Sequence, residues 1–87
     1  GKQFAIVEGA TDPAEMQRIA ASSGQPLTGF ILNADSSTAE VRFFSPTKEK
    51  GSSDSGALVV GEHMRRAGRI DGKVLVQMGE EGLEVFA

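Results

Sequence analysis

The chain contains no cysteine among its 87 residues, and it has a single histidine, His63. Without cysteine it cannot form a disulfide framework, a thiolate zinc site or a cysteine nucleophile. One histidine also cannot supply the several imidazoles of an ordinary histidine zinc site. We therefore expect no bound metal and no cofactor.

Long apolar runs are also missing. No segment approaches the roughly 20 apolar residues that cross a bilayer, and no charged and then apolar leader begins the chain. We therefore expect no membrane partner and, by default, a cytoplasmic protein.

The chain has fewer positively than negatively charged residues. Nine lysines and arginines stand against 12 aspartates and glutamates, so the net charge is −3. Binding to the phosphates of nucleic acid needs clustered basic residues. Glu62 and Asp71 interrupt the local cluster of Arg65, Arg66 and Arg69, so we expect no nucleic-acid partner.

Length limits how much surface the chain can bury. We expect a single domain over residues 1–87, which buries only roughly 60–65% of the surface of its unfolded chain. A partner subunit would cover apolar surface that so short a chain leaves exposed.

The most informative stretch is residues 52–68, which predicts a helix that is apolar on almost every side from Gly56 to Gly61. A helix without a polar face must be covered on most sides, so we expect the remaining chain to wrap around it. Ser52–Ser55 can accept hydrogen bonds from its first turn. Basic residues followed by Gly68 are typical of a helix C-terminus.

A shorter helix is predicted near the N-terminus. Asp12 can cap it, Pro13 suits its first position, and Ser22–Gly24 ends it. We expect Gln17 and Arg18 to point away from the core. The predicted buried face has helical spacing and consists of Met16, Ile19 and Ala20.

Apolar and alternating runs predict five strands. They span Gln3–Val7, Thr28–Asn33, Ala39–Phe44, Lys73–Met78 and Leu83–Phe86. The predicted turns are Asp35–Ser37, Ile70–Gly72 and Gly79–Gly82. The order β-α-β-β-α-β-β predicts an α+β fold, with a mixed or antiparallel sheet curled around the apolar helix. Ser45–Ser55 is predicted to be a polar loop, which is a common place for a site.

Three stretches carry motifs: Glu15–Ala20, Gly29–Leu32 and Val41–Glu49. In order and spacing they resemble the M-Q-x-I-A, T-x-F-V-L and R-F-F-T-P-x-x-E motifs of the phenazine-biosynthesis F-type (PhzF-like) isomerases, which have the diaminopimelate-epimerase fold. The similarity runs without a gap from about Ala5 to Met64. Members of that family are much longer and have two similar halves facing each other across a cleft. The resemblance therefore implies one half of that fold.

At two places the chain departs from the family's motifs. The family usually has N-x-S-E-T before the second strand, and the resemblance implies that its glutamate is the acid/base residue. Here Gly24–Thr28 places Leu27 at that position, and a leucine side chain cannot carry a proton. Where the family has G-H at the start of the apolar helix, this chain has Asp54–Ser55. The family's second carboxylate comes from the other half.

The start of the apolar helix, Ser52–Gly56, allows two interpretations. A helix N-terminus can hold an anion or a carboxylate, or Ser53 or Asp54 can simply cap the helix. We favour capping, because such caps are common and because the charge of Asp54 would compete with a bound anion. A hydrolase triad is not predicted, because about 12 Å of helix, at 1.5 Å per residue, separates Ser55 from His63.

Glu49 matches the family's glutamate in the third motif, and either lines a cleft or is a solvated charge between two lysines. Most phenylalanines and methionines must form the core of so small a domain. Phe44 is the exception, because it faces away from Val41 and Phe43, onto the other side of the sheet or a subunit contact. The remaining acidic group is interpreted as solvated turn residues rather than a metal site; it consists of Glu80, Glu81 and Glu84.

The sequence thus predicts a non-catalytic protein, derived from a PhzF-like half, that binds a small organic molecule in a cleft between two copies of the chain. The predicted ligand-binding residues are Leu27, Thr28, Phe44, Glu49, Ser53, Asp54, Ser55 and Gly56. Two alternatives stay open. The chain is an isomerase-type enzyme that uses other residues, such as Glu49 and Asp54 from facing subunits, or it is a subunit that needs a second polypeptide.

Overall fold

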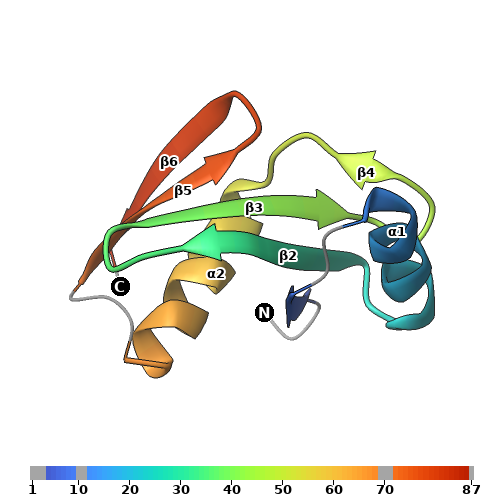
Figure 1. The fold of residues 1–87 in the computed structure, drawn as a ribbon, viewed down its shortest axis with the longest axis horizontal. Helices are drawn as coiled ribbons and strands as arrows, with labels where there is room; N and C mark the ends of the chain where they lie inside the picture. The colour runs from blue at the N-terminus through green and yellow to red at the C-terminus, as the bar shows by residue number, and fades with distance from the viewer. Residues whose placement is uncertain (1–3, 10–11, 69–71, 87) are drawn as a thin grey trace.

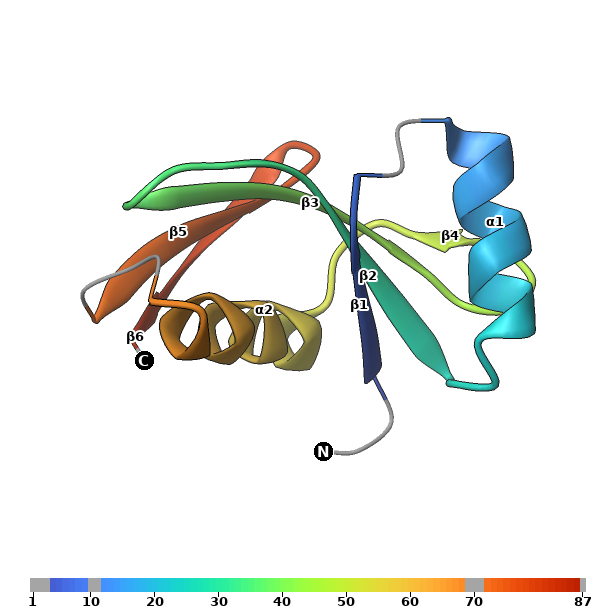
Figure 2. The same cartoon turned by 60° about the horizontal axis from the view of Figure 1, so that its bottom comes forward.

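The computed structural model describes residues 4–9, 12–68 and 72–86. The elements are β1 (Phe4–Glu8), α1 (Pro13–Ser22), β2 (Leu27–Ala34), β3 (Thr38–Phe44), β4 (Glu49–Lys50), α2 (Asp54–Arg66), β5 (Lys73–Met78) and β6 (Glu81–Phe86). The strands form one mixed sheet in the order β1-β2-β3-β5-β6, with β4 added beside β3. Figures 1 and 2 show this sheet curling around α2. The predicted α+β class and curled sheet are confirmed, and β4 is an addition within the predicted loop.

The sheet mixes both strand directions, because each helix connects two parallel neighbours. α1 joins β1 to its parallel partner β2, and the connection through α2 leads to β5, which lies parallel to β3. The hairpins β2–β3 and β5–β6 supply the antiparallel pairs. β3 changes partner along its length: Thr38–Val41 pair with β5, whereas Phe43 and Phe44 pair with β4. Arg42 lies at this change of partner.

The face of the sheet that meets α2, here called the concave face, carries the main core. This core consists of Leu27, Ile31, Ala39, Val41, Phe43, Ala57, Val60, Met64, Val74, Val76, Met78 and Val85. Phe43 is 1% exposed, and its ring lies against two glycines. A Cβ atom added at Gly56 would lie 2.7 Å from the ring, and one added at Gly29 would lie 2.9 Å from it. The absence of these two side chains lets the start of α2 approach β2 and β3 closely.

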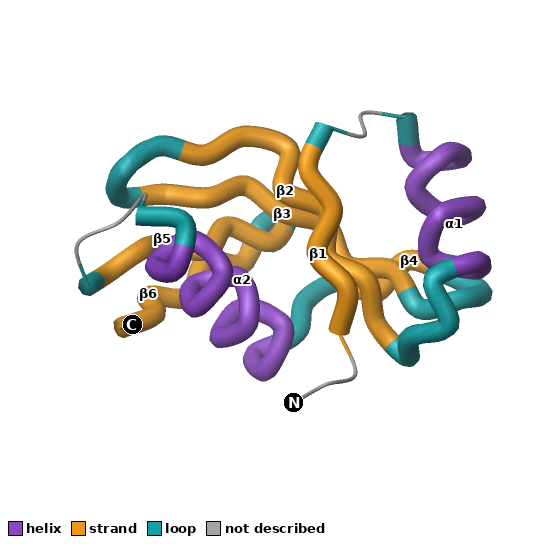
Figure 3. Tube along the Cα trace, turned by 90° about the horizontal axis from the view of Figure 1, so that it is seen from below, coloured by secondary structure: helices purple, strands orange, loops and turns teal. Residues whose placement is uncertain are grey.

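The far side of α2 is less covered than the sequence predicts. Leu58 is 56% exposed and Val59 is only half-buried. In Figure 3, α2 lies in front of the sheet and no described element crosses it. The expectation that α2 is covered on most sides is wrong for this flank, because the described sheet ends at β1 and β6 and reaches around only part of the helix.

The ends of both helices form as predicted. The hydroxyl of Ser53 accepts a hydrogen bond from the backbone N–H of Gly56 at 2.9 Å, and the carboxylate of Asp12 accepts one from the N–H of Ala14 at 3.3 Å. Gly68 follows α2 with a φ of +73°, a conformation in which a side chain would be strained. Neither helix of the described ranges has the length and apolar character needed to cross a membrane.

α1 covers one end of the opposite, convex face (Figure 2). A second apolar cluster forms there from Met16, Ala20, Phe30 and Phe44, with the two rings edge to face at a centroid distance of 5.5 Å. The predicted buried face of α1 is confirmed for Met16 and Ala20, and Ile19 packs beside them. The prediction for Gln17 is wrong: its amide donates to the backbone carbonyl of Ser45 at 2.9 Å, which ties α1 to the loop after β3.

Two turns show why the strand ends differ slightly from prediction. The Asp35 carboxylate accepts hydrogen bonds from the N–H groups of Ser37 and Thr38, and these bonds lower the pKa of Asp35. The second hairpin turns over only Gly79 and Glu80, so β6 begins at Glu81 rather than at Leu83. The predicted turn at 70–72 and the start of the first strand at residue 3 lie largely outside the described residues.

Candidate functional site

The structure places the eight predicted ligand-binding residues on both faces of the sheet. Leu27 belongs to the concave core, and Ser53 and Gly56 begin α2 on that side. Thr28 and Phe44 point to the convex face, because successive residues of a strand alternate between faces. No single cleft can therefore be lined by all eight residues.

Leu27 begins β2 and lies beside Phe4 of β1. Its side chain is 8% exposed and packs within the concave core, with Phe4 and Ile6 partly buried against the same cluster. Leu27, which the resemblance places where the N-x-S-E-T motif has its glutamate, therefore has apolar surroundings as well as an apolar side chain. No general acid or base can act from it.

Thr28 and Phe44 are engaged in structural contacts. Thr28 is fully buried, and its hydroxyl lies 3.1 Å from the hydroxyl of Ser23, at the end of α1. Phe44 is 3% exposed and packs on Phe30. These contacts hold α1 on the convex face, which is the first of the two positions that the sequence allows for Phe44. Neither side chain is available to a ligand in this conformation.

The start of α2 supports the capping interpretation. Ser53 caps the helix, Gly56 contacts the ring of Phe43, and the side chains of Asp54 and Ser55 are exposed. His63 lies far from Ser55 along the helix, and its Nε2 atom is 3.0 Å from a carboxylate oxygen of Glu8. The histidine therefore joins α2 to β1.

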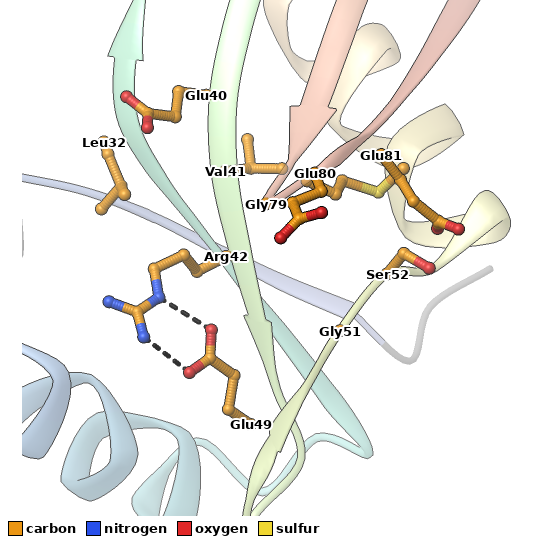
Figure 4. A pocket seen from close by; sticks show the side chains of 11 residues that line it. Leu32, Glu40, Val41, Arg42, Glu49, Gly51, Ser52, Gly79, Glu80 and Glu81 are labelled. Atoms are coloured by element: carbon orange, nitrogen blue, oxygen red, sulfur yellow. Dashed lines mark hydrogen bonds and ion pairs between the residues drawn. The ribbon is translucent and has the colours of Figure 1, made fainter.

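A hollow opens on the convex side, where β3 changes partner between β5 and β4 (Figure 4). Its lining includes Leu32, Glu40, Arg42, Glu49, Ser52, Met78, Glu80 and Glu81. Of the predicted site residues, only Glu49 belongs to it. The sequence points to Glu49 and its loop, but it could not place the hollow itself, because the change of partner depends on the return of β4 to β3. Among the described residues, no three histidine or acidic side chains gather closely enough to hold a metal ion.

Arg42 and Glu49 form the strongest polar contact of the hollow. The guanidinium donates to both carboxylate oxygens, at 2.7 and 2.6 Å (Figure 4), and lies over the ring of Phe44 at 5.8 Å from its centre. These hydrogen bonds lower the pKa of Glu49 and raise that of Arg42. Glu49 is thus held as a carboxylate and is a weaker proton acceptor than a free glutamate.

Replacing Glu49 with glutamine is expected to lower the free energy of unfolding by about 0.2–1 kcal/mol at neutral pH, which is typical of an exposed ion pair. Because folding lowers the pKa of Glu49 below its ordinary 4.5, its contribution is present above that value. It is lost as the pH falls through the lowered pKa of the folded state.

The difference between wild type and Glu49→Gln should therefore shrink in acid, as urea unfolding at several pH values would show. Asp35 and Glu62 also have lowered pKa values, that of Glu62 to about 2. Both residues are present in both proteins, so the difference isolates Glu49. A difference that grows in acid would contradict the assignment.

Comparison with known proteins gives similar folds but no sequence family. No family model matches the chain, and no curated protein matches it. Solved structures of phenazine biosynthesis proteins of the PhzF family do match. The one from Enterococcus faecalis is 19% identical with a TM-score of 0.80, over 97% of this chain and 32% of its own.

Two further structures agree. A phenazine biosynthesis PhzC/PhzF protein from Clostridium difficile (strain 630) is 20% identical with a TM-score of 0.80, over 95% of this chain and 32% of its own. A PhzF-family protein from Bacillus anthracis is 24% identical with a TM-score of 0.73, over 85% of this chain and 25% of its own. The chain thus has the fold of part of a PhzF-family protein and spans a quarter to a third of the length of these relatives.

Proposed function

We propose that this chain, with the fold of part of a PhzF-family protein, is a non-catalytic module that binds a small organic molecule in a cleft between two copies of itself. One observation carries the proposal: Leu27, at the position of the motif's acid/base glutamate, packs within the concave apolar core. Proton transfer needs a titratable group at the reacting atom, and an isobutyl group among apolar neighbours supplies none.

The class of ligand follows from the same surroundings. Around Leu27, the rings and methyl groups of Phe4 and Ile6 offer apolar contact, and the exposed start of α2 adds Asp54 and Ser55 as polar groups. Small-molecule sites are generally apolar with a few polar groups that fix orientation. The relatives' names place those proteins in phenazine biosynthesis, so flat cyclic organic molecules are the class that we propose.

Pairing of two copies is supported by what the chain leaves uncovered. α2 exposes Leu58 and leaves Val59 half-buried, and a domain of this size gains from burying further apolar surface. A second copy would cover part of this flank and close a cleft, as the second half does in the family that the sequence resembles. A single domain over residues 1–87 and a cytoplasmic location remain part of this proposal.

The enzyme alternative is less well supported. It uses other residues, such as Glu49 and Asp54 from facing subunits, and of these Glu49 is held by Arg42 as a weakly basic carboxylate. A subunit that needs a second polypeptide remains an alternative, because the relatives are three to four times longer than the part they share with this chain.

Native mass spectrometry of the protein purified from its own cells tests the proposal. We expect a complex of two identical chains together with a small molecule that is released when the complex is unfolded. A single chain without any added mass would contradict the proposal. A complex with a different polypeptide would favour the alternative of a second subunit.

A further inference from the structure

The two ends of the sheet differ in how they are protected. β6, at one end, carries Glu81 and Glu84, and Glu84 pairs with Lys73 at 3.5 Å. The added strand β4 also consists of two charged residues, Glu49 and Lys50. β1, at the other end, has no charge from Phe4 to Val7, and each of these four residues is only half-buried.

An apolar edge strand without charges is a template for pairing with another strand. In the described part of the chain, β1 pairs only with β2, so its outer side has no strand partner. Charges on an edge discourage such pairing, and β1 lacks them between Phe4 and Val7 whereas β6 and β4 carry them. The structure therefore distinguishes one edge at which a further strand can join the sheet.

We infer that two copies of this chain join through β1, which pairs antiparallel with β1 of the second copy across a twofold axis. This inference rests on the self-pairing in the proposed function and names the surface that achieves it. A second copy suits this edge because the uncharged residues Phe4–Ile6 can meet the same three residues of the second copy, so no like charges oppose each other there. A twofold arrangement also closes the assembly at two copies.

The twofold axis restricts the register of the pairing. For the concave faces of both copies to lie on the same side, the axis must pass through a residue rather than between two residues, because opposed residues share a face. The two residues in the middle of the uncharged segment Phe4–Val7 are Ala5 and Ile6. An axis at Ile6 would place the carboxylate of Glu8 opposite the ring of Phe4 in the second copy. An axis at Ala5 instead places Phe4 beside Ile6 of the second copy, which is an apolar pair. We therefore assign the axis to Ala5.

This register joins the two concave faces into one surface. Phe4 and Ile6 of both copies form a continuous apolar row, with Leu27 one strand away from the join in each copy. The two α2 helices lie on the same side of the joined sheet. The cleft of the proposed function then lies between the α2 helices, and its floor is made by both copies.

Sedimentation velocity of four proteins tests the inference: wild type, Ala5→Lys, Ala5→Glu and the control Glu84→Lys on the charged edge of β6. We expect wild type and Glu84→Lys to form dimers. In each Ala5 variant two like charges oppose each other, so we expect the dissociation constant to rise by roughly tenfold or more. An equal mixture of the two Ala5 variants should form dimers again, because lysine then faces glutamate.

Circular dichroism and thermal unfolding of each variant would confirm that it folds. Dimers of Ala5→Lys with unchanged affinity, or β1 amides that exchange hydrogen equally fast in monomer and dimer, would overturn the β1 assignment while leaving self-pairing intact. A wild-type chain that sediments as a monomer at high micromolar concentration would overturn the inference. Retention of a small molecule by that single chain would then show that binding does not need the second copy.

Discussion

Replacing Phe43 with alanine is expected to lower the free energy of unfolding by about 3–5 kcal/mol, which is the usual cost of truncating a buried phenylalanine. Phe43 is 1% exposed, and its ring fills the space between Gly29 and Gly56. Neither glycine has a side chain that could move into the cavity. Proteins are stable by only roughly 0.05–0.15 kcal/mol per residue, so this single change removes a large share of the stability of the chain.

Urea unfolding followed by circular dichroism would measure the loss. Phe43→Leu, which keeps most of the apolar volume, should cost about 1–2 kcal/mol and remain folded. Phe86→Ala is the matched control, because that ring is 74% exposed and such surface changes usually alter stability by less than about 0.5 kcal/mol. Equal losses for Phe43→Ala and Phe86→Ala would show that the contact between α2 and the sheet is not where the stability lies.

Leu27→Glu restores the carboxylate of the motif and is expected to lower the free energy of unfolding by about 2–4 kcal/mol at neutral pH. Leu27 is 8% exposed among apolar side chains, which favour the neutral form of a carboxyl group. The pKa of the new glutamate should therefore rise in the folded state. At pH values below the pKa of the unfolded state both states are protonated, so the loss is smallest there and grows as the pH rises.

Urea unfolding of Leu27→Glu between about pH 4 and pH 8 would detect this dependence. Leu27→Met keeps the volume and the apolar character, so it should cost less than about 1.5 kcal/mol at every pH. A Leu27→Glu protein as stable as wild type, with no dependence on pH, would mean that water reaches this position and that it could serve a charged catalytic group.

Local signals in the sequence predict most elements of this fold. Alternation along β3 correctly separates Phe44 from Val41 and Phe43. The capping residue Ser53 locates the start of α2, because these signals act within a few residues. Three motifs that resemble the PhzF family add the overall arrangement, and the structural matches confirm it at the level of the fold.

Contacts between distant residues are what the sequence could not supply. The sequence did not predict the exposed flank of α2, because it shows that Leu58 is apolar but not how far the sheet reaches around the helix. The pair of Arg42 and Glu49 depends on the return of β4 to β3, which pairs at only two positions. The pair of Glu8 and His63 joins residues 55 positions apart. Each contact depends on tertiary structure rather than on local pattern.

The predicted site residues lie on two faces of the sheet for the same reason. Leu27 and Thr28 are adjacent in sequence, yet a strand sends their side chains to opposite faces. Thr28 then reaches Ser23 behind the sheet, whereas Leu27 enters the concave core. A list of neighbouring residues therefore overstates a site on a strand by including both faces.

The proposal that the chain transfers no protons can be tested without knowing the ligand. The purified protein would be incubated in D₂O with a small-molecule extract of its own cells, and mass spectrometry would follow deuterium in carbon-bound positions against a sample without protein. Because Leu27 replaces the carboxylate and Glu49 is held by Arg42, we predict no protein-dependent gain of deuterium in any molecule. A molecule that gains deuterium only with the protein, and not with Glu49→Gln, would show that the chain is an enzyme.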